Sequence, residues 1–203
     1  MHWYDPAHNR HGILLVYALA AALAGTESAI LALALNPKVH PDYGAFYIDQ
    51  TTTCLNRDVL GSYSLGQIVS FRRDGRKSAN NIKVCGWTGP AGDGTHSLGD
   101  ISRLRVNLAN PGRDLLATLE MSAVLRPPTT QQRVLISVNG RQLAKVVLAD
   151  PNPSKVMFEI PGGATTLEIS FAYLDGFPPN RSASNIYKRA IRLVSFMLEE
   201  ASD

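Results

Sequence analysis

A glycine-rich loop holds the residues of this sequence whose types are best suited to binding a ligand. Asp93, His96 and Asp100 lie close together in it, and carboxylate and imidazole groups are common ligands of metal ions. Trp87 precedes them, and an aromatic ring can stack on the face of a sugar. Polar residues more often serve only to keep such a loop solvated, so we predict no metal here. We interpret Trp87, Asp93 and His96 as a loop that contacts a ligand or a partner.

The sequence motifs of the common catalytic classes are absent. There is no G-x-S-x-G nucleophile turn, no H-E-x-x-H zinc motif, no Walker loop and no G-x-G-x-x-G that opens a helix. No C-x-x-C-H motif offers a site for haem attachment. We therefore expect no catalytic residues, no cofactor and no enzymatic activity.

Two cysteines, Cys54 and Cys85, lie 31 positions apart. In an oxidising compartment they can form one disulfide bridge. Loop-closure entropy predicts that this bridge stabilises the fold by ~3–4 kcal/mol. The alternative is a pair of unrelated buried thiols in a cytosolic domain. We expect the bridge if the residues after the first apolar segment lie outside the cytoplasm.

The composition excludes several classes of protein. Of the 203 residues, 45% are hydrophobic and 18% are charged, which excludes a disordered chain. The net charge of +3 is too small to indicate binding to nucleic acid. The one charge run, Arg72 to Lys77, is suited on an outward-facing loop to contact lipid headgroups or an acidic partner. A solvated turn is the alternative.

An apolar segment over residues 12–35 predicts a transmembrane helix. As a helix it measures ~36 Å, which spans a hydrocarbon core of about 30 Å with some tilt. Asp5 followed by Pro6 is typical of a helix start, and Asn36-Pro37 is typical of a stop.

A cleaved signal peptide is the alternative, with Ala22-Leu-Ala24 as its cleavage site. We favour a retained helix because apolar residues resume from Ala29 and the chain still carries Met1. The flanking charges, Arg10 and Lys38, leave the orientation nearly undecided. A short tail is easily left in the cytoplasm, so we place the residues after 36 outside.

Two features of the helix indicate contacts with other membrane subunits. Ala21, Gly25 and Ala29 are four apart, a spacing of small residues that allows close approach of another helix. Glu27 lies about 200° around the helix from this seam. A carboxylate within a bilayer costs ~2.5–3.5 kcal/mol at the centre and usually faces protein or water. Chance spacing in an alanine-rich helix, and a Glu27 that reaches the interface, are the alternatives.

From Gln67 onward the pattern changes to short β-rich runs separated by turn residues. Asn139-Gly140, between two such runs, predicts a hairpin. No alternation of helices and strands supports a parallel sheet. We predict a mainly β fold, an antiparallel, jelly-roll-like β-sandwich. The expected strands are residues 67–71, 82–85, 101–108, 115–125, 133–138, 143–148, 156–160, 166–173 and 191–198.

Three stretches of this region carry a resemblance to a known family. Residues 63–71 read YSLGQIVSF, residues 86–97 read GWTGPAGDGTHS, and residues 132–140 read QRVLISVNG. They resemble a β-sandwich domain found at the C-terminal end of bacterial membrane glycosyltransferases and surface-polysaccharide proteins, a family of largely unknown function. The resemblance covers roughly residues 60–200 and implies an extracytoplasmic sandwich in a bacterial envelope.

The sequence departs from that family at three positions of the second stretch. Ala91 replaces an acidic residue, and Asp93 and His96 replace two tryptophans. These are residue types that a sugar site uses, so their loss favours a scaffold reused for contacts with protein. Separately, Trp3 with Asp5-Pro6 before an apolar helix resembles the start of light-harvesting polypeptides, although the helix lacks their central histidine.

These observations together predict four parts: a short cytoplasmic tail (1–11), a transmembrane helix (12–35), a connector (36–66) and an extracytoplasmic β-sandwich (67–203). We expect a non-catalytic, single-pass accessory subunit of the bacterial inner membrane, with its sandwich in the periplasm. The host is polysaccharide machinery or an energy-transducing assembly, such as a photosynthetic one. The alternative is a periplasmic carbohydrate-binding module, which exposed aromatic residues around Trp87, Tyr173 and Phe177 would support and their burial would contradict.

Overall fold

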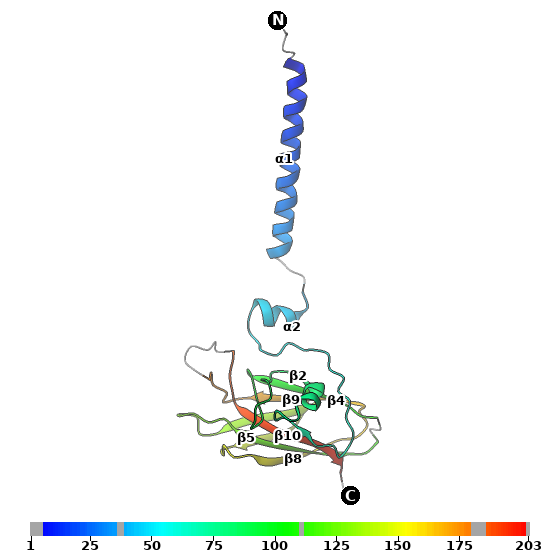
Figure 1. Ribbon diagram of the computed structural model, residues 1–203, viewed down its shortest axis with the longest axis vertical. Coiled ribbons are helices and arrows are strands. Elements are labelled where there is room, and N and C mark those ends of the chain that lie inside the picture. The colour runs from blue at the N-terminus through cyan, green and yellow to red at the C-terminus, as the bar shows by residue number, and fades with distance from the viewer. Residues whose placement is uncertain (1–5, 36–38, 110–111, 180–185, 202–203) are drawn as a thin grey trace. The chain divides into compact units, whose positions relative to one another are not determined.

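The computed structural model describes residues 6–35, 39–109, 112–179 and 186–201, without the side chains of residues 6–11 and 42. The chain divides into two units, one up to His40 and one from Pro41 onward. The first unit contains a single helix, and the second contains all of the strands (Figure 1).

The first unit is the helix α1 (Pro6–Leu35). Its segment Gly12–Leu35 has a mean hydropathy of 1.8 and no side chain buried within the chain, so by length and composition it can cross a membrane. A signal sequence near an N-terminus has the same length and composition. The helix ends where the sequence predicts, whereas Trp3, Asp5 and Asn36-Pro37 lie outside the described residues.

The second unit is an antiparallel β-sandwich, as the sequence predicts. Figure 1 shows β5, β8 and β10 in one layer and β2, β4 and β9 in the other. The first sheet has the order β1-β10-β5-β8, with β3 also paired to β10: β1 (Val69–Ser70), β3 (Thr95–His96), β5 (Leu115–Ala123), β8 (Ser154–Ile160) and β10 (Ile191–Glu200). The second has the order β2-β4-β9-β6-β7: β2 (Lys83–Cys85), β4 (Ile101–Asn107), β6 (Gln132–Val138), β7 (Arg141–Leu148) and β9 (Thr166–Tyr173).

Alternating side chains of the long strands build the core between the sheets. In β4 and β9 every second residue is buried, because successive side chains of a strand point to opposite faces. Burying this apolar surface supplies most of the free energy that favours the sandwich. The predicted hairpin is present: Val138 pairs with Arg141, and Asn139 and Gly140 both adopt the positive φ that such a tight turn requires.

The sequence analysis missed three short helical elements and one strand. The helix α2 (Pro41–Tyr43) and the π-helix η1 (Gly44–Ile48) occupy part of the segment predicted as an irregular connector. The helix α3 (Arg76–Ile82) begins inside the charge run, and it buries Ala79 and Ile82 against the sandwich. The missed strand is β3, which has only two residues.

Candidate functional site

The helix residues singled out in the sequence are exposed on α1. Ala21, Gly25 and Ala29 lie on the exposed surface of the helix, and a side-chain carbon added at Gly25 meets nothing within 4 Å. The seam is therefore accessible to another helix. Whether these residues contact a partner stays a prediction.

The polar break in α1 leaves one side chain without a partner. Thr26 donates to Leu23 O at 2.7 Å, and Ser28 donates to Ala24 O at 2.8 Å, so the helix itself satisfies both hydroxyls. Glu27 has no hydrogen bond or ion pair with any residue that the structure describes. Within the polar break, its carboxylate is the one side-chain group that the described residues leave unpaired.

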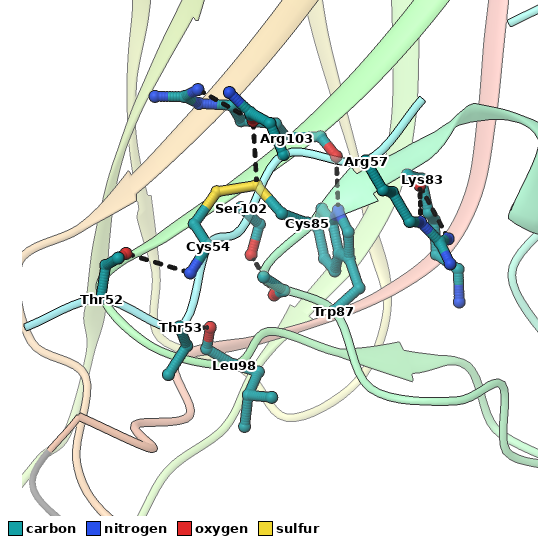
Figure 2. The surroundings of a disulfide bond; sticks show 12 residues. Thr52, Thr53, Cys54, Arg57, Lys83, Cys85, Trp87, Leu98, Ser102 and Arg103 are labelled. Carbon is teal, nitrogen blue, oxygen red and sulfur yellow. Dashed lines mark hydrogen bonds between the residues drawn. A yellow bond between two sulfur atoms is a disulfide. The ribbon is translucent and has the colours of Figure 1, made fainter. Parts of the chain in front are cut away.

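Cys54 and Cys85 form a disulfide, with their Cα atoms 4.8 Å apart. Cys85 ends the edge strand β2, and Cys54 belongs to the segment that runs past it (Figure 2). Thr53 donates to Leu98 O nearby, and Val84 packs with the disulfide in a small buried cluster. The bridge therefore fastens residues 51–57 to the edge of the second sheet.

Trp87 packs against the hydrophobic core of the sandwich. Its ring contacts Phe171 edge to face, with centroids 5.5 Å apart, and lies 6.2 Å from the ring of Phe71. Its Nε1 donates to Arg103 O at 3.0 Å, as Figure 2 shows. The indole is half-buried, so packing and this hydrogen bond fix its position.

The platform of exposed aromatic residues that would have supported a carbohydrate-binding module is not formed. Tyr173 is buried at 5% exposure, because it lies on the inner face of β9. Phe177 is half-buried beneath the guanidinium of Arg126, 4.7 Å from its ring centroid. With Trp87 packed on the core, these three rings offer no shared surface for stacking on a sugar.

Asp93 and His96 serve the fold at their own positions. Asp93 accepts a hydrogen bond from Arg192 Nη1 at 2.7 Å, and this contact lowers the pKa of the carboxyl. His96 belongs to β3, where burial, with Arg189 nearby, lowers the pKa of its imidazole. Asp100 is paired with Lys188 at 2.8 Å. Among the described residues no three metal-binding side chains gather at one place.

The motif residues that carry the family resemblance also have structural roles. Tyr63 Oη accepts a hydrogen bond from Leu198 N at 2.7 Å and donates to Gln67 O, which ties the first stretch to β10. Gly86 has φ +74°, and a side-chain carbon there would lie 2.1 Å from a backbone oxygen of β4. Gly94 has φ +142° and a similarly close neighbour in β10. These positions are required by the sandwich itself.

The charge run is not an outward-facing loop throughout. Residues 72–75 form a turn in which Asp74 accepts from Ser70 Oγ at 3.0 Å, and Arg76 then begins α3. Helix α3 turns Arg76 toward a cavity of about 520 Å³. We call this the basic cavity. Its lining residues are Phe46, Thr53, Leu55, Arg57, Arg76, Asn80, Lys83, Val84, Cys85, Trp87, Thr88, Gly89 and Pro90.

Three cations from separate segments meet at the basic cavity. Arg57 donates from Nε and Nη2 to Lys83 O, at 2.9 and 2.8 Å, and Figure 2 shows its guanidinium against β2. Lys83 is only 4% exposed, and its Nζ donates to Thr88 O at 3.1 Å. Burial, together with the charges of Arg57 and Arg76, lowers the pKa of Lys83 to about 8. Sequence reasoning missed this group because its members are far apart along the chain.

No protein-family model matches the chain, and no curated protein matches its sequence. Among solved structures, the chain is similar to the CBM36-1 domain of a multidomain xylanase from the hindgut metagenome of Trinervitermes trinervoides, with 14% identity and a TM-score of 0.42 over 68% of this chain and 98% of that one.

Two further solved structures are similar to the chain. One is a family 6 carbohydrate-binding module, with 8% identity and a TM-score of 0.42 over 71% of this chain and 100% of that one. The other is the EclA C-terminal domain, described as a sugar-binding protein, with 12% identity and a TM-score of 0.37 over 50% of this chain and 68% of that one. At these values the likeness concerns the β-sandwich fold and carries no information about the ligand of this chain.

Proposed function

We propose that this chain is a non-catalytic, single-pass subunit of a larger membrane protein complex, held in the bilayer by α1. The observation that carries the proposal is Glu27, a carboxylate in an apolar helix with no partner among the described residues. Such a group costs ~2.5–3.5 kcal/mol at the bilayer centre. A neighbouring transmembrane helix that presents a cation or a hydrogen-bond donor removes most of this cost.

The small-residue seam supports a second contact on another side of α1. Glu27 lies about 200° around the helix from Gly25 and from Ala29, so one neighbouring helix cannot easily cover both faces. Small residues allow two helix backbones to approach closely, which favours packing between membrane helices. A helix with two different faces suits a place among several subunits. The resemblance of residues 63–71 and 86–97 to envelope-polysaccharide proteins makes polysaccharide machinery the first host to examine.

The disulfide supports placing the sandwich on the oxidising side of the membrane. Bridges persist in the periplasm and are rare in the cytosol, where thiols are kept reduced. With one membrane span, this orientation leaves residues 1–11 in the cytoplasm. The sandwich then lies in the periplasm, beside the outer face of the host complex.

Purification of the full chain from its native membrane in a mild detergent tests the proposal. We expect a fixed, stoichiometric set of integral membrane proteins to co-purify with the wild type. Replacing Glu27 by leucine should reduce the recovery of that set several-fold, because the apolar residue cannot bind the partner's polar group. The matched control is Glu159→Leu, which removes an exposed carboxylate of β8 outside α1.

Two results would contradict the proposal. The first is isolation of the wild type as a monomer without stoichiometric companions. The second is an unchanged set of companions in the Glu27→Leu variant, which would show that the carboxylate meets no partner.

The burial of Tyr173 and the half-burial of Trp87 and Phe177 contradict glycan binding on an aromatic platform. A second candidate function is glycan binding at a different place, and the basic cavity is the observation that favours it. Its volume of about 520 Å³ lies within the ~300–1,000 Å³ of small-molecule pockets. Trp87 and Phe46 supply apolar wall, and the side-chain amide of Asn80 is a polar group suited to hydroxyls. Calorimetric titration of the full chain with envelope oligosaccharides tests it, and the absence of heat with every sugar would exclude it.

A further inference from the structure

The positive charge of the basic cavity is not compensated within the described chain. No lining residue is an aspartate or a glutamate, and neither Arg57, Arg76 nor Lys83 forms an ion pair with a described residue. Elsewhere on the sandwich, cations such as Arg133 and Arg192 do have carboxylate partners, at 2.6 and 2.7 Å. The cavity thus gathers three cations and no carboxylate among its lining residues.

The central cation of the three is held in place by the fold. Lys83 lies in the edge strand β2, and at 4% exposure its stem is covered by the surrounding residues. Arg57 is fixed by its two hydrogen bonds to the backbone of the same lysine. A buried cation beside two arginines costs free energy, since desolvation and repulsion both oppose it. A bound anion removes both costs.

The remaining lining residues suit a ligand larger than a single oxyanion. Asn80 presents an exposed side-chain amide from α3, with no partner among the described residues. The Thr88 hydroxyl, in contrast, already accepts a hydrogen bond from His96 N and donates one to Gly89 O. The half-buried indole of Trp87 adds a rigid apolar surface. This combination of cations, amide and aromatic ring is chemically matched to a charged sugar.

We propose that the basic cavity binds an anionic sugar residue, with its carboxylate or phosphate placed between Arg57, Arg76 and Lys83. The inference rests on the glycan-binding candidate and is independent of the anchoring role of α1. It names an acidic glycan as the class of ligand.

The cavity also has room beside it for further sugar units. Arg57 and Asn80 line a second hollow of about 790 Å³, together with Asp58, Val59, Leu60, Ser62, Lys77, Ser78 and Asn81. Because Arg57 and Asn80 line both, the two hollows lie next to each other. An oligosaccharide with one acidic unit in the basic cavity can therefore extend along α3.

Isothermal titration of the full chain in an uncharged detergent tests the proposal with glucuronate, glucose 6-phosphate, glucose and glycerol phosphate. We expect at least one of the two anionic sugars to bind at least 10-fold more tightly than glucose and than glycerol phosphate. Arg76→Gln should weaken that binding about 10-fold or more, because it removes a charge-assisted contact. Arg76 is exposed and makes no intrachain hydrogen bond or ion pair with a described residue, so this variant should fold. The matched control is Arg72→Gln, an exposed arginine that does not line the basic cavity, which should leave the affinity unchanged.

Each contrary outcome overturns a defined part of the account. Glucose that binds as tightly as both anionic sugars would refute the anionic site and leave glycan binding intact. Glycerol phosphate that binds as tightly would assign the cavity to a lipid headgroup. Equal losses in the Arg76→Gln and Arg72→Gln variants would show that only overall charge matters. No binding of any probe would refute both the inference and the glycan candidate.

Discussion

Replacing Lys83 by methionine should stabilise the sandwich at neutral pH, even though it removes a buried contact. Methionine keeps the unbranched shape of the lysine stem, whereas the buried charge beside Arg57 and Arg76 is lost. The fall in the pKa of Lys83 from 10.5 to about 8 corresponds to about 3 kcal/mol between its charged and neutral forms. The lost hydrogen bond to Thr88 O offsets about 1 kcal/mol of this gain, so the Lys83→Met variant should be more stable than the wild type by about 2 kcal/mol at pH 7.

The sign of this effect gives it a distinctive dependence on pH. Between about pH 8 and 10.5 the unfolded wild type binds more protons at Lys83 than the folded protein does. Lys83 therefore increases the wild-type free energy of unfolding as the pH rises through that window, whereas the Lys83→Met variant has no such increase. The difference between the two proteins should change by about 3 kcal/mol from pH 7 to pH 10.5.

Fluorescence can measure this difference in the full chain. The protein has two tryptophans, so a Trp3→Phe background leaves Trp87, which lies in the sandwich, as the reporter. Denaturant unfolding in an uncharged detergent, without reductant, gives the free energy at each pH. Groups common to both proteins cancel in the difference. A difference that stays constant from pH 7 to pH 10.5 would refute the buried, charged state of Lys83.

Three further variants test the sandwich by the same unfolding measurement. Gly86→Ala should lower the free energy of unfolding by more than about 2 kcal/mol, because Gly86 has a positive φ and a backbone oxygen would lie 2.1 Å from the added carbon. The control Gly89→Ala, with open space around the added carbon, should lower it by less than about 1 kcal/mol. Equal losses in the two variants would contradict the packing at Gly86. Replacing Cys54 and Cys85 together by serine should lower the free energy of unfolding by about 3–4 kcal/mol through lost loop closure, and an unchanged stability would show that the bridge does not form in the full chain. Tyr63→Phe should cost about 1–3 kcal/mol by leaving a buried amide of β10 unpaired, and a neutral effect would exclude that contact.

The strands could be predicted from the sequence because their signal is local. Alternation in β4 and β9, and the turn at Asn139-Gly140, depend on neighbours along the chain. The same alternation places Tyr173, two residues after Phe171, on the inner face of β9. It therefore also predicts that Tyr173 cannot belong to an exposed aromatic platform. Helix α3 could not be predicted from the sequence, because Ala79 and Ile82 are its only buried residues and two positions are too few to form a helical apolar pattern.

The basic cavity could not be predicted from the sequence. Arg57, Arg76 and Lys83 belong to a loop, a helix and an edge strand, and only the folded chain brings them together. The charge run includes Arg76, but nothing in the sequence pattern indicates that Lys83 is buried. Conversely, Asp93 and His96 are only three positions apart in the sequence, and the fold pairs Asp93 with Arg192 and places His96 in β3.

The anchoring role of α1 can be tested most directly by photo-cross-linking within the native membrane. A photoreactive residue at Leu31, one turn from Glu27 on the same face of α1, should form one defined adduct with another integral membrane protein. The Glu27→Leu change in the same chain should abolish that adduct. Cross-linking to lipid alone, or an adduct that is unaffected by Glu27→Leu, would contradict a subunit contact at this carboxylate.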